Sequence, residues 1–307
     1  MTSSRPRRFH RVVDGILLLD KPLGLSSNEA LQRVRALYGA LKAGHGGSLD
    51  PLASGLLPVC FGQATKVCGT LLGATKTYRV TLRLGERTAS GDLETDIVER
   101  APVPPLTQAH IETVLASFIG ISTQVPPMHS ALRVDGKRLY ELARQGHSIE
   151  REARQIAIDT ASLLSWAMPD LQIEVSCSKG TYIRSLAEDI ARQLGTIAHV
   201  TALRRTSVSP FQAGQMQTLE ALAEATSQER DAALLPLDTT FTADPKITLT
   251  EAQLERFLRG QTLVEPACPE APQVCVYGPG GRFIGLAASS SGRLQPSRLF
   301  VDVTTLV

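Results

Sequence analysis

Residues 44–58 read Gly44-His-Gly-Gly-Ser-Leu-Asp-Pro-Leu-Ala-Ser-Gly-Leu-Leu-Pro58, a glycine-rich loop that runs into an apolar stretch. Glycines let a backbone approach a ligand closely, and Pro51 fixes the turn directly after Asp50. The loop matches neither the phosphate-binding pattern GxxxxGK[ST] nor the nucleophile pattern GxSxG. It therefore predicts a tight ligand-facing turn before a strand near 56–61.

Asp50 is the one side chain of this loop that is suited to covalent chemistry. Its carboxylate is ionised at neutral pH, because the reference pKa of an aspartate is about 3.9, and it can attack or stabilise an electron-poor carbon. The loop alone favours the alternative that Asp50 caps a turn. His45 is a base or a flat group that stacks on nucleotides, with a structural histidine as the alternative. Ser48 and Ser54 lie too close in sequence for a triad, which excludes a serine hydrolase.

Moving outward, the pattern of apolar residues predicts strands at 15–20, 77–84, 171–178 and 198–208. The strict alternation from Leu171 to Ser178 is the clearest of these. Helices are predicted after the capping box Ser26/Glu29, around 111–118 and over 183–194. Tyr78 then lies on a strand, and Tyr182 and Arg184 lie where a strand meets a helix. Core packing is the alternative for both tyrosines, and a surface ion pair is the alternative for Arg184.

Length and composition exclude several classes of protein. The 307 residues are 43% hydrophobic and 20% charged, enough for a real core and, at roughly 150 residues per domain, for about two domains. No apolar run approaches the ~20 residues of a membrane span, and the basic start is not followed by an export signal, so a cytoplasmic protein is expected. The five cysteines form no CxxC pair, which predicts reduced thiols and neither a disulfide framework nor a metal site.

Charge is distributed unevenly along the chain. Residues 1–211 carry 25 Lys and Arg against 19 acidic residues, a net charge of +6, whereas residues 212–243 carry −4 and residues 244–307 balance. This excess permits a polyanionic partner without arguing strongly for one. Residues 125–154 hold six basic residues against four acids and predict an exposed, partly helical insertion. Short apolar runs after 244 predict a small β-rich domain.

The stretch 44–58 closely resembles the catalytic motif of the TruB-type tRNA pseudouridine-55 synthases. Further blocks agree with that family in order and spacing, namely Gly15-Ile-Leu-Leu-Leu-Asp-Lys-Pro22, Lys76-Thr-Tyr-Arg-Val80, Pro126-Pro-Met-His-Ser-Ala131, Cys177-Ser-Lys-Gly-Thr-Tyr-Ile-Arg184 and Ala202-Leu-Arg-Arg205. The resemblance runs from about residue 12 to 243. The chain departs from the family pattern at Gly46, Ser48, Ala89-Ser90 and His129. The segment after 243 resembles the PUA-type RNA-binding domain.

The resemblance implies an α+β pseudouridine synthase fold, with a mixed, largely antiparallel sheet flanked by helices and a small β-rich PUA-like domain. It implies a basic tail at 1–11, a catalytic domain at 12–243 with an RNA-clasping insertion at 125–154, and an RNA-binding domain at 244–307. Its catalytic residues would be Asp50, Tyr78 and Arg184. Its substrate-binding residues would be His45, Tyr182, Leu203 and Lys21.

The implied reaction is isomerisation of uridine 55 in the T-arm of tRNA to pseudouridine. The reaction imports no group and oxidises nothing, so neither cofactor nor metal is expected. The expected partner is tRNA, with no DNA, membrane or obligatory protein partner, and the protein is expected to be a monomer. Asp50 could add to the ribose or the base, or abstract a ribose proton.

Two alternatives stay open at this point, and the first of them is not an enzyme. One is an RNA-binding or RNA-folding protein with a vestigial pocket, and the other is a synthase that depends on a guide RNA. Intact Asp50, Tyr78 and Arg184 favour an enzyme, and the full insertion favours one that grips RNA unaided.

Overall fold

The computed structural model describes residues 11–130, 132–134, 137–147, 149–265 and 268–301. Its largest element is a nine-stranded sheet in which the strands follow the order β1-β3-β12-β4-β11-β10-β7, with β2 on β3 and β13 on β12. Every neighbouring pair is antiparallel except β3 and β12, which are parallel. The predicted mixed, largely antiparallel sheet is therefore confirmed. Its strands are β1 Gly15–Lys21, β2 Ala43–His45, β3 Ala53–Phe61, β4 Lys76–Leu84, β7 Gly120–Gln124, β10 Arg154–Ala167, β11 Asp170–Cys177, β12 Ala198–Val208 and β13 Phe211–Gln212.

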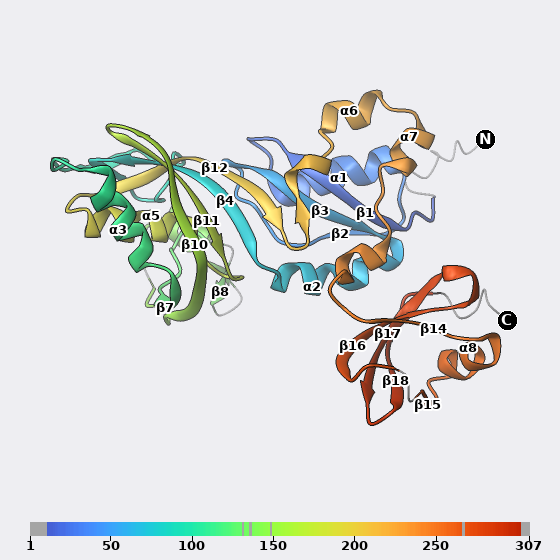
Figure 1. Cartoon of the computed structure of the whole chain (residues 1–307). Coiled ribbons are helices and arrows are strands. Elements are labelled where there is room, and N and C mark those ends of the chain that lie inside the picture. Colours follow the sequence, from blue (N-terminus) through green and yellow to red (C-terminus); the bar gives the residue numbers. More distant parts are fainter. Residues whose placement is uncertain (1–10, 131, 135–136, 148, 266–267, 302–307) are drawn as a thin grey trace, which may run out of the picture.

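The long strands β4 and β12 run through the middle of the molecule and join two lobes (Figure 1). Helices α3 and α5 cover the sheet in one lobe, and α1 and α2 accompany β1 and β3 in the other (Figure 1). The helices are α1 Ser27–Tyr38, α2 Cys68–Gly73, α3 Gln108–Ser117, α4 Leu139–Arg144, α5 Ile183–Gln193, α6 Leu219–Glu224, α7 Ser227–Ala232 and α8 Glu251–Leu258. No helix among the described residues is long and apolar enough to span a membrane.

Strands β1 and β3 are buried on both faces, which explains their nearly continuous apolar sequences. Leu17 and Leu19 pack on α1 and α6, while Ile16 and Leu18 belong to a second cluster that includes Leu71 of α2. Helix α1 begins with the predicted capping box of Ser26 and Glu29. The structure extends two of the predicted strands, because β1 includes Lys21 and β3 begins at Ala53.

Strand β11 shows the alternation that its sequence predicts. Leu171, Ile173 and Val175 are buried in the cluster that also holds α3 and α5, and the residues between them point the other way. The neighbouring strand β4 alternates in register, with Tyr78 opposite Val175. One face of this part of the sheet is thus packed under helices and the other is open.

Strands β7 and β10 were not predicted from the sequence, because β10 is interrupted by bulges and β7 is the exposed edge strand next to it. Strand β10 contains two register shifts against β11, between Ile158 and Thr160 and between Leu163 and Ser165. Each bulge changes which residues face the core, so no period of two survives along the strand. Most residues of β7 are exposed. Between these two strands lie a short hairpin, β8 Arg133–Val134 with β9 Lys137–Arg138, and helix α4.

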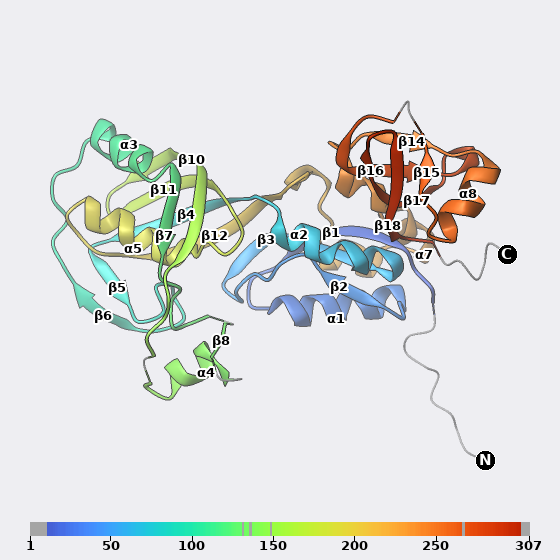
Figure 2. The same cartoon turned by 90° about the horizontal axis from the view of Figure 1, so that it is seen from below.

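The insertion therefore has the predicted partly helical character, and it projects from the ends of β7 and β10 (Figure 2). Its predicted last residue, Arg154, is already the first residue of β10. A further small sheet of β5 Glu86–Thr88 and β6 Ile97–Arg100 lies at the edge of the same lobe.

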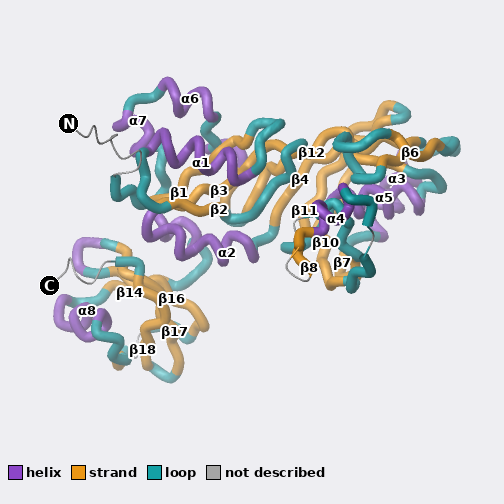
Figure 3. The backbone as a smooth tube through the Cα atoms, turned by 180° about the vertical axis from the view of Figure 1, so that it is seen from behind, coloured by secondary structure: helices purple, strands orange, loops and turns teal. Residues whose placement is uncertain are grey.

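The C-terminal part is β-rich, as predicted. Its sheet follows the order β14-β16-β17-β18-β15 and surrounds a core of its own that includes Phe257, Val274 and Leu294. The strands are β14 Lys246–Thr248, β15 Leu263–Val264, β16 Ala271–Tyr277, β17 Phe283–Ser290 and β18 Arg293–Leu299. It lies beside α2 and away from the α3/α5 lobe (Figure 3). Its assignment as PUA-like, and the domain limits, stay predictions.

The predicted N-terminal tail falls mainly outside the described residues, which begin at Arg11. Arg11 forms an ion pair with Asp231 of α7. The five cysteines are free thiols.

Candidate active site

The order of strands brings the predicted site residues together. Strand β12 lies between β3 and β4, so the loop before β3 comes close to Tyr78 on β4. Helix α5 adds Arg184 from its first turn and Tyr182 from its N-terminal cap. A cavity of about 110 Å³ forms where these elements meet, and it is lined by Ser48, Leu49, Asp50, Tyr78, Thr181, Tyr182, Ile183, Arg184 and Leu203. Five of the seven predicted site residues therefore line one small cavity.

Asp50 and Arg184 form the central contact of this cavity. A guanidinium nitrogen of Arg184 lies 2.9 Å from a carboxylate oxygen of Asp50. The side chain of Arg184 is 5% exposed, whereas that of Asp50 is 47% exposed. The alternative that Arg184 makes a surface ion pair is therefore wrong, because α5 turns its first residues toward the sheet.

Three further partners hold the Arg184 guanidinium in place. It donates to the backbone carbonyls of Ser90, at 2.9 Å, and His129, at 2.7 Å. The carboxylate of Asp92 lies 3.6 Å away. These partners fix the position of the guanidinium, and its ion pair holds the Asp50 carboxylate at the cavity.

The protonation of Asp50 is set by opposing effects. Removal of water from its surroundings raises the pKa of the Asp50 carboxyl above its ordinary value, and the nearby carboxylates of Asp92 and Glu94 act in the same direction. The charges of Arg184 and Lys21 lower it. The side chain remains about half exposed, so bulk solvent moderates these effects.

The two tyrosines of the cavity are enclosed to different degrees. Tyr78 is 8% exposed, and burial raises the pKa of its hydroxyl. Burial likewise raises the pKa of the half-buried Tyr182. The backbone of Tyr182 is held by Gln124, whose amide oxygen accepts from the Tyr182 N–H at 2.8 Å and whose amide nitrogen donates to its carbonyl at 3.1 Å. Both rings keep neutral hydroxyls against the cavity.

His45 and Lys21 do not line this cavity. Burial lowers the pKa of His45, so the ring is a neutral, flat group, and its Nδ1 accepts a long contact of 3.4 Å from the Gly47 N–H. Lys21 is fully buried and donates to the carbonyls of Pro22 and Leu25. Burial lowers the pKa of Lys21 to about 8. This geometry gives Lys21 a supporting position, and its role in substrate binding stays a prediction.

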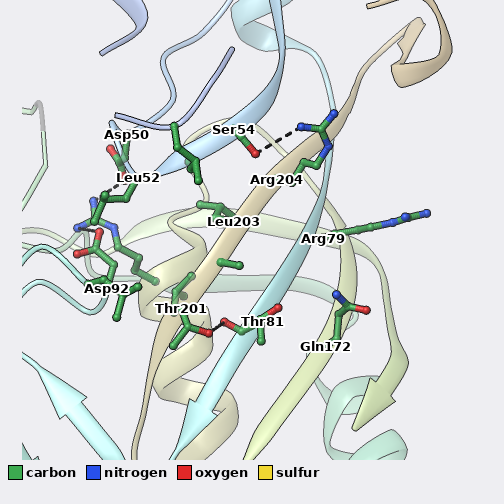
Figure 4. Close-up of a pocket in the computed structure, with 16 residues that line it drawn as sticks. Asp50, Leu52, Ser54, Arg79, Thr81, Asp92, Gln172, Thr201, Leu203 and Arg204 are labelled. Atoms are coloured by element: carbon green, nitrogen blue, oxygen red, sulfur yellow. Dashed lines mark hydrogen bonds and ion pairs between the residues drawn. The ribbon is translucent and has the colours of Figure 1, made fainter. Parts of the chain in front are cut away.

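A larger cavity of about 440 Å³ adjoins the small one at Asp50, Arg184 and Leu203. It extends across β12 and β4 toward Arg204, Thr81 and Gln172 (Figure 4). Arg204 makes a bidentate pair with Asp20, at 2.7 and 2.9 Å, and lies on the other side of Leu203 from Asp50 (Figure 4). A large group could therefore lie against the open face of the sheet while a smaller part of it enters the site.

Several supporting residues could not be recognised from the sequence. Asp92 and Gln124 act through partners that lie far from them in the chain, and Ser27 is a buried serine whose hydroxyl contacts the backbone of Leu49. The capping box next to Ser27 indicated a helix start, but nothing in the sequence indicated that the loop of Asp50 would be its neighbour. Within the described ranges, no three His, Cys, Asp or Glu side chains gather as metal ligands would.

Solved structures share this fold over nearly the whole chain. A chain of a Cbf5-Nop10-Gar1 complex aligns with a TM-score of 0.73 at 24% identity, covering 98% of this chain and 88% of the other. A chain of an H/ACA RNP bound to a substrate RNA containing 2'-deoxyuridine aligns with a TM-score of 0.72 at 22% identity, covering 95% and 86%. At these identities the likeness concerns the fold alone.

Sequence comparison carries the identification further. Residues 35–183 match the model of the TruB family pseudouridylate synthase N-terminal domain. Residues 184–242 match the tRNA pseudouridylate synthase B C-terminal domain, and residues 245–300 match the C-terminal model of pseudouridine synthase II TruB. The fold and these matches define the chain as a pseudouridylate synthase.

Close relatives narrow the class. A tRNA pseudouridine synthase B of Burkholderia mallei (strain ATCC 23344) is 51% identical over 305 residues, which cover 97% of this chain and 98% of the relative. The protein of that name from Chromohalobacter salexigens is 47% identical over 301 residues, covering 98% and 92%. The chain belongs to the TruB family.

Proposed function

We propose that this protein isomerises uridine 55 in the T-arm of tRNA to pseudouridine. The observation that carries the proposal is the Asp50–Arg184 pair at 2.9 Å in a cavity that also holds Tyr78, Tyr182 and Leu203. Two relatives named tRNA pseudouridine synthase B, which are 51% and 47% identical in sequence, support tRNA as the substrate.

The target base has to leave the RNA stack before it can react. Flipping a nucleotide costs a few kcal/mol of lost stacking and pairing. The ring of Tyr78 in the small cavity would recover part of this by stacking on the uracil. The neutral, flat His45 beside the loop would occupy the vacated place in the RNA. The wider cavity would take the neighbouring part of the RNA arm.

The reaction breaks the N-glycosidic bond, turns the uracil and forms a carbon–carbon bond to the same ribose. Asp50 is the ionised group placed to act on the sugar or the base. A charge-assisted bond from Arg184 keeps this carboxylate charged and oriented. The Tyr78 hydroxyl, neutral in its buried position, is placed to take part in the final proton transfer. The product is an isomer of the substrate, because the proton lost from the ring carbon is balanced by one gained at the freed ring nitrogen, so the chemistry requires no imported group.

We also propose that the domains divide this work. Residues 12–243 would form the catalytic unit, residues 125–154 would clasp the RNA arm, and residues 244–307 would bind RNA as a PUA-like domain. A basic insertion that projects from the ends of β7 and β10 favours this arrangement, because Lys and Arg hold phosphates without reading sequence (Figure 2). The protein is proposed to act as a monomer without a protein partner.

The deciding experiment is incubation with an unmodified tRNA transcript, followed by carbodiimide modification and primer extension. A stop at position 55 is expected in the wild-type transcript and not in a transcript with cytidine there. Binding without a stop would favour an RNA-binding protein with a vestigial pocket. A stop that appears only after a guide RNA is added would favour a guide-dependent synthase.

A further inference from the structure

Arg205 is one of the largest side chains that the fold encloses completely. It is 1% exposed and lies on β12 beside the loop that carries Asp50. Among the described residues, the hydrogen-bond partners of its guanidinium are backbone carbonyls and not a carboxylate. Burying an arginine is costly unless several hydrogen bonds satisfy it, so this arrangement needs an explanation.

The guanidinium of Arg205 reaches both ends of the catalytic loop. It donates to the carbonyls of Gly47 at 3.0 Å and Ser48 at 3.3 Å, which precede Asp50, and to the carbonyl of Leu56 at 2.7 Å, which follows it. The planar guanidinium therefore connects the backbone segment before Asp50 to the segment after it. A lysine could not reproduce this fork of donors.

The backbone of Arg205 is fixed as well. Gly55 is its partner in the parallel β3–β12 pairing, and a Cβ on Gly55 would lie 2.2 Å from the Arg205 carbonyl oxygen. On its other side Arg205 is opposite Tyr78 in the β12–β4 pairing. The same residue thus links the loop of Asp50 to the strand of Tyr78.

We propose that Arg205 is a positioning residue, which holds the Asp50 loop in register with Tyr78 so that the carboxylate meets the flipped nucleotide in its reactive position. The inference rests on the proposed function. Arg205 lines neither of the two cavities at Asp50, so it acts through the loop and not by touching the substrate.

The test compares Arg205→Lys with a matched control on the same strand. Ser207→Ala removes another buried polar side chain, which is 7% exposed and donates to the carbonyl of Phe211 at 2.9 Å, away from the loop. Single-turnover pseudouridine formation on the tRNA transcript and tRNA affinity are measured for folded protein of each variant. Hydrogen exchange of peptides spanning residues 44–56 reports on the loop without any reaction.

For Arg205→Lys, the single-turnover rate constant is expected to fall about ten- to hundredfold, because a displacement of about 1 Å can cost that much. Its tRNA affinity is expected to stay at the wild-type value, and the loop is expected to exchange faster. Ser207→Ala is expected to keep the wild-type rate and loop exchange. Arg205→Gln removes the positive charge, which Arg205→Lys keeps, as well as the fork of donors. It is expected to show the same loss of rate and faster loop exchange, and it replaces the lysine variant in the test if that variant does not fold.

A wild-type rate with wild-type loop exchange in Arg205→Lys would overturn the proposal. Equal losses of single-turnover rate in Arg205→Lys and Ser207→Ala would overturn it too, because they would indicate general destabilisation. A failure of both Arg205 variants to fold would also overturn it, for the same reason. A wild-type protein that forms no pseudouridine would instead reject the proposed function, and the exchange comparison would still decide whether Arg205 holds the loop.

Discussion

The two charged residues at the centre of the site are held unequally. Arg184 is buried, and its nitrogens are satisfied by two carbonyls as well as by Asp92. Asp50 is half exposed, and Arg184 is the cation in direct contact with it. A fixed cation and a reachable anion suit a reaction in which the anion meets the substrate, because the charge is oriented before the substrate arrives.

This arrangement predicts the effect of Asp50→Asn. The amide keeps the size of the side chain but has no negative oxygen to act on the nucleotide, so pseudouridine formation is expected to fall below detection while tRNA still binds. Carbodiimide primer extension and a filter-binding titration measure the two properties. Undiminished product from Asp50→Asn would defeat the assignment of Asp50 as the reacting group.

The pH dependence of the reaction should report the environment of Asp50. The carboxylate is the active form and its pKa is raised in the fold, so the single-turnover rate should fall as pH decreases through a midpoint above the ordinary aspartate value of about 3.9. Glu94 contributes to this elevation, so Glu94→Gln should move the midpoint to lower pH. Glu112→Gln, on the exposed face of α3, is the control, and an equal shift in both variants would contradict the explanation.

At the scale of secondary-structure elements, helix α1 supports the loop that carries Asp50. Ser27, at its first position, is 4% exposed, accepts from the Leu49 N–H at 2.7 Å and donates to the Leu49 carbonyl at 3.1 Å. The N–H of Gly24 donates to the Pro51 carbonyl at 2.8 Å. The residues on either side of Asp50 are therefore fixed, one to the first residue of α1 and the other to the turn that precedes this helix.

Ser27→Ala is expected to leave both polar groups of Leu49 without partners and to lower the free energy of unfolding by about 1–3 kcal/mol. Ser26→Ala, which removes the neighbouring N-cap, is expected to cost about 0.5–2 kcal/mol. Urea denaturation measures both losses. Hydrogen exchange separates them, because only Ser27→Ala should speed exchange at Leu49, and equal exchange in the two variants would argue against this support.

The insertion is the second element with a testable role. If Arg151 and Arg154 bind RNA phosphates, replacing both with Gln should weaken tRNA binding and make it less dependent on salt. The slope of log K against log salt should become shallower by about 0.7 to 0.9 for each phosphate that is no longer neutralised. Each single replacement is compared with Arg33→Gln, on the exposed side of α1, which makes the same charge change. Unchanged affinity at every salt concentration would count against an RNA clasp.

At the scale of the whole molecule, the C-terminal sheet is attached through an aromatic cluster. Phe300 is 5% exposed, with its ring centroid 5.5 Å from that of Phe283 and 6.1 Å from that of Phe241. Lys66 donates to the Leu299 carbonyl at 2.8 Å, which adds a polar contact from the 3₁₀ helix Gly62–Val67. The two parts share one hydrophobic cluster at this junction.

Phe300→Ala should therefore weaken the attachment, with a loss of about 3–5 kcal/mol for the buried aromatic side chain. Calorimetry is expected to show the C-terminal part unfolding separately from the rest. Phe257→Ala, in the core of the C-terminal sheet itself, should instead lower the stability of that sheet alone. A single cooperative transition in the Phe300 variant would contradict the proposed attachment.

The amino-acid sequence by itself determined the features that depend on near neighbours in the chain. The alternation of β11, the capping box of α1, the glycine-rich loop around Asp50 and the resemblance to the TruB family are all contained in short runs of residues. Such patterns follow from the repeat of a strand or the first turn of a helix, which adjacent residues set. The tertiary structure decided the burial of Arg184, the support from Asp92 and Gln124, and the contacts of Arg205 with the loop that carries Asp50. These features depend on which strands become neighbours, since β12 lies between β3 and β4 although it is far from both in the sequence. Bulges such as those in β10 also interrupt the alternation by which a strand is recognised in the sequence.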